Sequence, residues 1–158
     1  MDADERRQAQ TLRVFFARKF ASGLKESMVI PEKFADLFTK EKKAFAFLAL
    51  VKKDGTPQVT PLWFDYDGTH IIINTARGRV KDKILKRHPR VALAIQDPAN
   101  AYRYIQIRGK VVDETEVGGY DQICTLAEKY RGKREYPKNP GEVRVTYKIL
   151  PEKMNTMG

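Results

Sequence analysis

The chain has 158 residues, is 42% hydrophobic, carries a net charge of +10 and holds one cysteine, Cys124. This composition excludes an intrachain disulfide and a cysteine-based zinc site, and no apolar run is long enough to cross a membrane or to form a signal-peptide core, so we expect a globular, cytoplasmic protein. The basic charge predicts either an anionic partner, such as nucleic acid, an acidic membrane surface or a polyanionic small molecule, or a surface on which lysines only solvate the protein.

Two helices are predicted at the start of the chain. Residues 4–26 place apolar side chains at helical spacing among basic ones. This pattern suits packing on the domain or on a partner subunit, with a membrane surface as the alternative. Pro31 predicts the first turn of a second helix over 32–40. We therefore expect residues 1–29 to form a helical extension ahead of the main domain.

Six strand-like runs with short turns follow. The predicted strands cover residues 44–51, 56–66, 69–75, 90–96, 102–113 and 142–149. A turn over 52–55 and the dipeptide Asp67-Gly68 predict two hairpins. This pattern is typical of a mainly β (α+β) protein, built as a small antiparallel barrel with flanking helices.

A helix over 116–131 is predicted late in the chain, because apolar side chains recur on one side and Gly132 supplies a stop. Residues 133–141 form a Pro-rich loop before the last strand. We expect the main domain to cover residues 30–152 and residues 153–158 to form a tail.

A basic helix start lies in the middle of the chain. A short helix over 80–88 follows a Gly-containing turn, with Arg79 and Lys81 at its start. Free backbone N–H groups, the helix dipole and two side-chain charges converge there, which predicts an anion site. On a β framework this favours a phosphate-bearing cofactor. The alternative is that Arg79, Lys81 and Lys83 form a solvated helix face.

No side-chain constellation for acid–base, nucleophilic or metal chemistry is present in the sequence. There is no nucleophile elbow, HExxH or Walker loop, and His70 and His88 lack metal-ligand spacing. Cys124 lies on an apolar helix face, which is typical of a core thiol. An enzyme whose cofactor carries the reactive atom needs only to bind it, aim it and exclude water. We therefore predict no catalytic side chain and no metal.

Four motifs occur in a fixed order: PxVTPLWF, a DG hairpin, NTARGRVKxxxLxRxPRVALxxxDP and YRYxxxRGxV. Together they resemble the flavin/deazaflavin oxidoreductase split-barrel family, the pyridoxamine 5′-phosphate oxidase-like superfamily, and within it the branch that uses the deazaflavin coenzyme F420. The resemblance implies a six-stranded antiparallel split β-barrel with a Greek-key path. It also implies a homodimer with cofactor sites at the subunit interface.

The resemblance further implies cofactor-binding residues by position. Arg79 and Lys81, with Val80 between them, match the family's phosphate-binding pair, and Lys83 falls where another basic residue is common. The other matches are Thr60, Pro61, Leu62 and Trp63 on the strand lining the isoalloxazine-type ring, Asn74, Thr75 and Ala76 beside the ring and ribityl chain, and Tyr102, Arg103 and Tyr104 on the segment that reaches across from the partner subunit.

The function implied is hydride transfer between reduced coenzyme F420 and an unsaturated small-molecule substrate. The alternatives are an FMN-dependent oxidoreductase of the same fold, a non-enzymatic cofactor-binding protein, or a basic nucleic-acid-binding protein. Nucleic acid is disfavoured because no recognition motif is present, although aromatic residues at 102–104 can stack on bases. The chain has no histidine after His88, where the oxidase itself is expected to carry an Arg-x-His element, and this disfavours vitamin B6 as substrate.

Coenzyme F420 is favoured over FMN by charge. Its phosphate continues into a lactyl and oligoglutamate tail, and basic residues are available for it at Lys83, Lys86, Arg87 and in the N-terminal segment. We also expect dimerisation to cover apolar surface that the strand over 102–113 places at the barrel edge.

Overall fold

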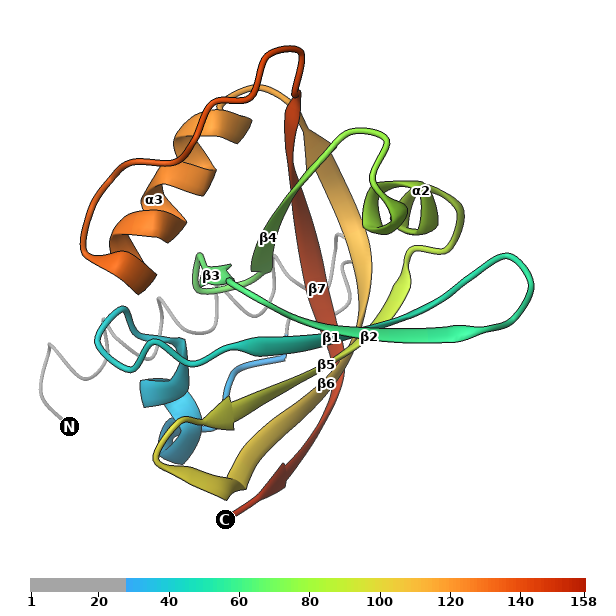
Figure 1. Ribbon diagram of the computed structural model, residues 1–158. Coiled ribbons are helices and arrows are strands. Elements are labelled where there is room, and N and C mark those ends of the chain that lie inside the picture. Colours follow the sequence, from blue (N-terminus) through green and yellow to red (C-terminus); the bar gives the residue numbers. More distant parts are fainter. Residues whose placement is uncertain (1–27) are drawn as a thin grey trace, which may run out of the picture.

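The computed structural model describes residues 28–158, so the predicted helix over 4–26 lies outside the described residues (Figure 1). The described part holds one antiparallel sheet with the strand order β2-β1-β5-β6-β7-β4-β3. Its strands are β1 (Ala46–Val51), β2 (Pro57–Leu62), β3 (Asp65–Tyr66), β4 (Ile71–Ala76), β5 (Arg90–Asp97), β6 (Asn100–Thr115) and β7 (Arg144–Met157). Figure 1 shows this sheet strongly curled. The protein is thus mostly β, as the sequence predicts, but with seven strands rather than six.

Three helices flank the sheet within residues 28–158: η1 (Glu32–Phe38), α2 (Val80–Arg87) and α3 (Gly119–Arg131). α2 and α3 confirm the predicted helices, whereas η1 is a 3-10 helix and shorter than the predicted 32–40. β4 runs between α2 and α3 and contacts both (Figure 1). No helix in this part of the chain combines the length and apolarity that a bilayer crossing requires.

The seventh strand arises because the predicted strand 56–66 breaks in the middle. β2 ends at Leu62, and the fully buried Phe64 leaves the ladder before β3 begins. The Phe64 N–H donates to the Tyr130 hydroxyl at 3.3 Å, and the Phe64 carbonyl accepts from Lys129 Nζ at 3.0 Å. Side chains of α3 therefore satisfy the backbone groups that a neighbouring strand would otherwise bond.

The last strand is longer than the sequence predicts. β7 continues through Pro151 and pairs with β6 as far as Met157, opposite Tyr104. The register shifts beside Gly109, which lies opposite Pro151, and a bulge there lets the ladder continue past a residue without an N–H. A Cβ on Gly109 would lie 2.7 Å from the Leu150 carbonyl oxygen, so only glycine permits this approach. The predicted tail is therefore wrong.

Both predicted hairpins are confirmed. Gly55 N–H donates to the Lys52 carbonyl at 2.9 Å between β1 and β2. Between β3 and β4, the Asp67 carboxylate accepts from the N–H groups of Thr69 and His70, and Gly68 adopts a φ of 91°. A left-handed residue suits glycine, so the DG signal specifies this turn locally.

The outward side of β1, β2 and β5 forms an exposed apolar face. Phe47 lies opposite Pro61 and Ala94, and Ala49 lies opposite Val59 and Ala92. This side of β1 also carries Val51, and Val59 is 65% exposed. β6 does not border the sheet, since it lies between β5 and β7. The expectation that the strand over 102–113 places apolar surface at the edge is therefore wrong, and the apolar face lies on β1, β2 and β5.

An ion network joins η1 to the hairpin between β5 and β6. Arg103 donates to Asp36 at 2.6 Å and to Asp97 at 2.8 Å, and Lys42 lies 3.2 Å from Asp97. The Ala99 N–H and the Arg103 guanidinium hold the pKa of Asp97 at about 2, below its ordinary value of 3.8. The β5–β6 hairpin and η1 are thus tied by charges that need Asp97 ionised.

We expect the stabilising effect of Asp97 to disappear in acid. Because its folded pKa is depressed, its contribution is complete above about pH 4 and is lost as the pH falls toward 2. Urea unfolding should show that the wild type has a larger free energy of unfolding than Asp97→Asn at pH 6. This difference should shrink toward zero near pH 2. Asp113→Asn, at an exposed position on β6, is the control. A difference that stays constant with pH would contradict this prediction.

Candidate functional site

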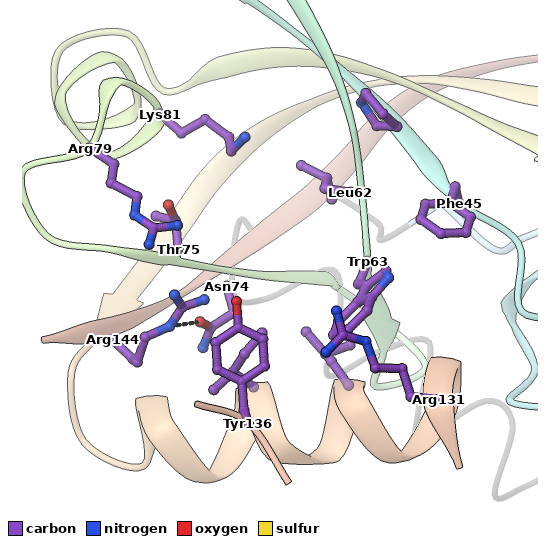
Figure 2. A pocket seen from close by; sticks show the side chains of 13 residues that line it. Phe45, Leu62, Trp63, Asn74, Thr75, Arg79, Lys81, Arg131, Tyr136 and Arg144 are labelled. Atoms are coloured by element: carbon purple, nitrogen blue, oxygen red, sulfur yellow. Dashed lines mark hydrogen bonds between the residues drawn. The ribbon is translucent and has the colours of Figure 1, made fainter. Parts of the chain in front are cut away.

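An open pocket lies where β2, β4 and the start of α2 face α3 and the loop before β7 (Figure 2). Its volume is about 290 Å³. The residues that line it are Phe45, Pro61, Leu62, Trp63, Asn74, Thr75, Arg79, Lys81, Ile123, Leu126, Arg131, Tyr136 and Arg144. The pocket therefore combines aromatic and aliphatic side chains with four cationic ones.

The start of α2 supplies two of these cations. Arg79 is the residue before the first helical turn, and its carbonyl accepts from Lys83 N–H at 3.0 Å. Lys81 Nζ donates to the Thr60 hydroxyl at 3.2 Å and has no carboxylate partner within residues 28–158. Burial and the nearby Arg79 charge lower the pKa of Lys81. An anion bound here would relieve both effects, and free N–H groups at the helix start would help to hold it.

Asp82 anchors this helix start from behind. Its buried carboxylate accepts from the Gly78 N–H at 2.9 Å, from Arg77 at 3.0 Å and from the Tyr147 hydroxyl at 2.6 Å. Burial opposes ionisation of Asp82, but these hydrogen bonds outweigh it and lower its pKa. Gly78 has a φ of 81°, which glycine adopts without strain. The turn that presents Arg79 is thereby fixed to the core strand β7.

A second cationic group comes from the start of β7. The Arg144 side chain is 5% exposed and donates to Asn74 Oδ1 at 2.9 Å and to Glu142 at 3.2 Å (Figure 2). Arg79 reaches the other oxygen of Glu142 at 2.7 Å. Glu142 is thus shared between two arginines of the pocket.

An aromatic group forms another part of the pocket. Trp63 stacks on Tyr130 with centroids 5.2 Å apart and planes 5° apart, and Tyr136 approaches Trp63 edge-on at 6.4 Å. The Arg131 guanidinium lies 4.7 Å from the Trp63 ring centroid. A flat aromatic ligand could pack against such a surface, with cations nearby to balance negative charge.

The predicted cofactor residues fall into two groups. The structure brings Pro61, Leu62, Trp63, Asn74, Thr75, Arg79 and Lys81 together around the pocket, and Thr60 bonds Lys81 there. Ala76, Val80 and Lys83 do not line it, and neither do Tyr102, Arg103 and Tyr104 within one chain. The cofactor role of all these residues stays a prediction.

Several pocket residues were not predicted from the sequence. They lie outside the motifs: Phe45 directly before β1, Ile123, Leu126 and Arg131 on α3, Tyr136 in the loop after α3, and Arg144 at the start of β7. One signal was available, since Arg131 and Gly132 mark the end of α3 and the Pro-rich loop follows. The sequence gives no sign that this loop returns over β4.

A curled antiparallel sheet with a basic, aromatic-lined pocket is the form of a split-barrel protein of the flavin-binding type. The family model for pyridoxamine 5′-phosphate oxidase matches residues 30–157, and the chain belongs to this family. The resemblance stated from the sequence motifs is thereby confirmed. The family includes oxidoreductases and binds flavin-type cofactors.

Solved structures give the same result. An F420 reductase matches with a TM-score of 0.70 and 31% identity, covering 80% of this chain and 98% of the other. A conserved hypothetical protein from Mycobacterium tuberculosis matches with a TM-score of 0.62 and 20% identity, covering 86% of this chain and 89% of the other. General Stress Protein 26 from Bacillus anthracis matches with a TM-score of 0.59 and 17% identity, covering 80% of this chain and 92% of the other. At these identities, the last two structures show the fold alone. No curated protein matches this chain.

Proposed function

We propose that this protein is an oxidoreductase that transfers a hydride between reduced coenzyme F420 and an unsaturated organic substrate. The observation that carries the proposal is the pocket itself, in which an anion-binding helix start at Arg79 and Lys81 adjoins a flat aromatic surface at Trp63. The similarity to an F420 reductase at 31% identity supports the choice of deazaflavin. FMN is the alternative cofactor, because it shares the ring shape and the phosphate.

The residues present fit such a cofactor. Arg79 and Lys81 would hold the phosphate, and Leu62 and Trp63 would pack against the ring, which supplies the hydride chemistry when bound. Thr60 would orient Lys81 through their 3.2 Å contact. The protein's part in this reaction is to bind, to orient and to exclude water, and we assign it no acid–base side chain.

We further propose that the working form is a homodimer with the site at the interface. The pocket's 290 Å³ lies just below the roughly 300–1,000 Å³ range of small-molecule sites, so one chain would enclose only part of a cofactor. The exposed apolar face of β1, β2 and β5 adjoins the pocket through Pro61 and needs a cover. Tyr102 is 74% exposed near the start of β6, and we propose that it reaches the partner's pocket together with Tyr104. Arg103 is bound to carboxylates of its own chain instead.

The cofactor assignment is tested by titrating the protein with F420 and FMN at several salt concentrations. The only tryptophan, Trp63, lines the pocket, so its fluorescence should be quenched by either ligand. We expect F420 to bind more tightly than FMN at low salt. It should also lose more affinity as salt is added, because exposed tail contacts are screened beyond about 8 Å at physiological ionic strength.

A variant separates tail contacts from ring contacts. Lys86 and Arg87 are exposed in the last turn of α2 and do not line the pocket. Changing both to glutamine should reduce the salt dependence for F420 and leave FMN binding unaltered. If FMN co-purifies and F420 cannot displace it, FMN is the cofactor and the F420 assignment is wrong. If neither ligand quenches Trp63, the proposed function is wrong.

A further inference from the structure

Glu142 is a carboxylate beside the pocket that contacts two of its arginines. Its two oxygens contact different arginines, Arg79 at 2.7 Å and Arg144 at 3.2 Å, and its side chain is only 14% exposed. Lys81 and Arg131, the other two cations of the pocket, have no carboxylate partner within residues 28–158. Glu142 therefore supplies the negative charge that Arg79 and Arg144 contact.

The two arginines are held very differently. Arg144 is nearly fully buried, donates to Asn74 as well as to Glu142, and lies 5.1 Å from the Tyr136 ring centroid. The Arg79 side chain is 53% exposed, and Glu142 is its one ion-pair partner within residues 28–158. An entering anion can therefore draw Arg79 away from Glu142, whereas Arg144 would have to leave a buried, multiply bonded position.

The loop before β7 holds the carboxylate in place. Glu142 N–H donates to the Asn139 carbonyl at 3.1 Å in a turn that contains Gly141, whose φ is 73°. Burial opposes ionisation of Glu142, but hydrogen bonds from Arg144 and Asn139, with the charges of both arginines, outweigh it and lower its pKa. The carboxylate thus stays charged near neutral pH and stays on Arg144 when Arg79 moves.

We propose that Glu142 is a resident competitor for Arg79, which an anionic ligand must displace before Arg79 and Lys81 can hold it. This inference rests on the proposed role of Arg79 as a phosphate ligand. It assigns Glu142 a part in specificity, because a carboxylate beside the site repels weakly bound anions and admits those that also engage Lys81 and the helix start. The Glu142–Arg144 pair remains intact in the bound form.

Glu142→Gln removes the charge and keeps the shape. We expect it to tighten binding of inorganic phosphate and of FMN by about twofold to fivefold, the upper part of the range that partly exposed ion pairs give. Phosphate binding would be followed by phosphorus NMR line widths and FMN binding by Trp63 fluorescence. Glu135→Gln is the matched control, because Glu135 lies exposed in the same loop without an ion pair to Arg79 or Arg144.

In an Arg79→Ala background the gain from Glu142→Gln should fall to that of the control, because the competition needs Arg79. Unchanged or weaker binding in folded Glu142→Gln would overturn the proposal, since Glu142 would then position Arg79 rather than compete for it. A gain of the same size in Glu135→Gln would overturn it as well, because net charge would explain the effect.

A measurement on the wild-type chain does not depend on the variant folding. During a phosphate titration followed by nitrogen NMR of arginine side chains, the Arg79 signal should shift and the Arg144 signal should stay. Movement of both signals, or of Arg144 alone, would contradict the proposal. Phosphate lacks a ring, so this result is distinguishable from the cofactor assignment: failure of F420 and FMN to bind would leave the phosphate response of Arg79 intact.

Discussion

Replacing both Arg79 and Lys81 by alanine is expected to weaken binding of F420 or FMN by about a hundredfold or more, with the fold retained. Each charge-assisted hydrogen bond to a phosphate contributes about 1.5–3 kcal/mol, and 1.4 kcal/mol corresponds to a factor of ten. Either single change should therefore cost about tenfold or more. Fluorescence titration of Trp63 measures the affinity, and circular dichroism with thermal unfolding reports on the fold.

Lys83→Ala is the matched control for this experiment. Lys83 lies on the same helix, is exposed and carries the same charge as Lys81, but it does not line the pocket. Its removal should change affinity by less than about threefold, the effect expected of an exposed charge at a distance. Equal losses in Lys83→Ala and Lys81→Ala would mean that the helix attracts the ligand only through its total charge. Unchanged affinity in well-folded Arg79→Ala would remove Arg79 from the site.

Val59→Glu is expected to convert the protein from a dimer to a monomer at micromolar concentration. Val59 lies in the exposed apolar face of β1, β2 and β5, opposite Ala49. Apolar burial contributes about 25 cal/mol per Å², and a carboxylate placed in that contact would also have to be desolvated. Sedimentation velocity measures the association state. Cofactor affinity should fall together with the loss of dimer, because we propose that the partner completes the site.

Val117→Glu provides the control, since Val117 is 88% exposed between β6 and α3 and lies outside this face. It should leave the association state and cofactor affinity unchanged. Val51→Glu, at a second exposed position of the same face, should reproduce the effect of Val59→Glu. A wild-type protein that sediments only as a monomer at micromolar concentration would contradict the interface model, although the pocket within one chain would remain.

The local signals in the sequence were sufficient for the hairpin turns and for the C-terminal end of α3. Gly68, with a φ of 91°, and Gly132, with a φ of 78°, occupy left-handed positions that other residues avoid, so the hairpin and the end of α3 depend on a few neighbouring residues. The helix over 80–88 was predicted for the same reason and forms as α2. Such features depend on interactions within a few residues, and a sequence pattern therefore specifies them.

Elements that depend on distant partners were predicted less well. The run 56–66 has continuous strand character, yet it breaks at Phe64 because Lys129 and Tyr130 of α3 bond its backbone. The strand β7 passes through Pro151 because Gly109 on β6 allows a bulge opposite it. These partners lie far from Phe64 and Pro151 in the sequence. No local pattern therefore indicates that the contacts form.

The sequence by itself determined the mostly β class, the family resemblance, the basic helix start at Arg79 and Lys81 and the aromatic position of Trp63. Only the tertiary structure decided that Arg144 and Glu142 lie beside them, and that β4 carries Asn74 between two helices. The physical reason is that side chains far apart in the chain meet only once the sheet has curled. Whether a charge near a pocket attracts a ligand or neutralises a neighbouring arginine depends on distances of a few ångströms between such side chains.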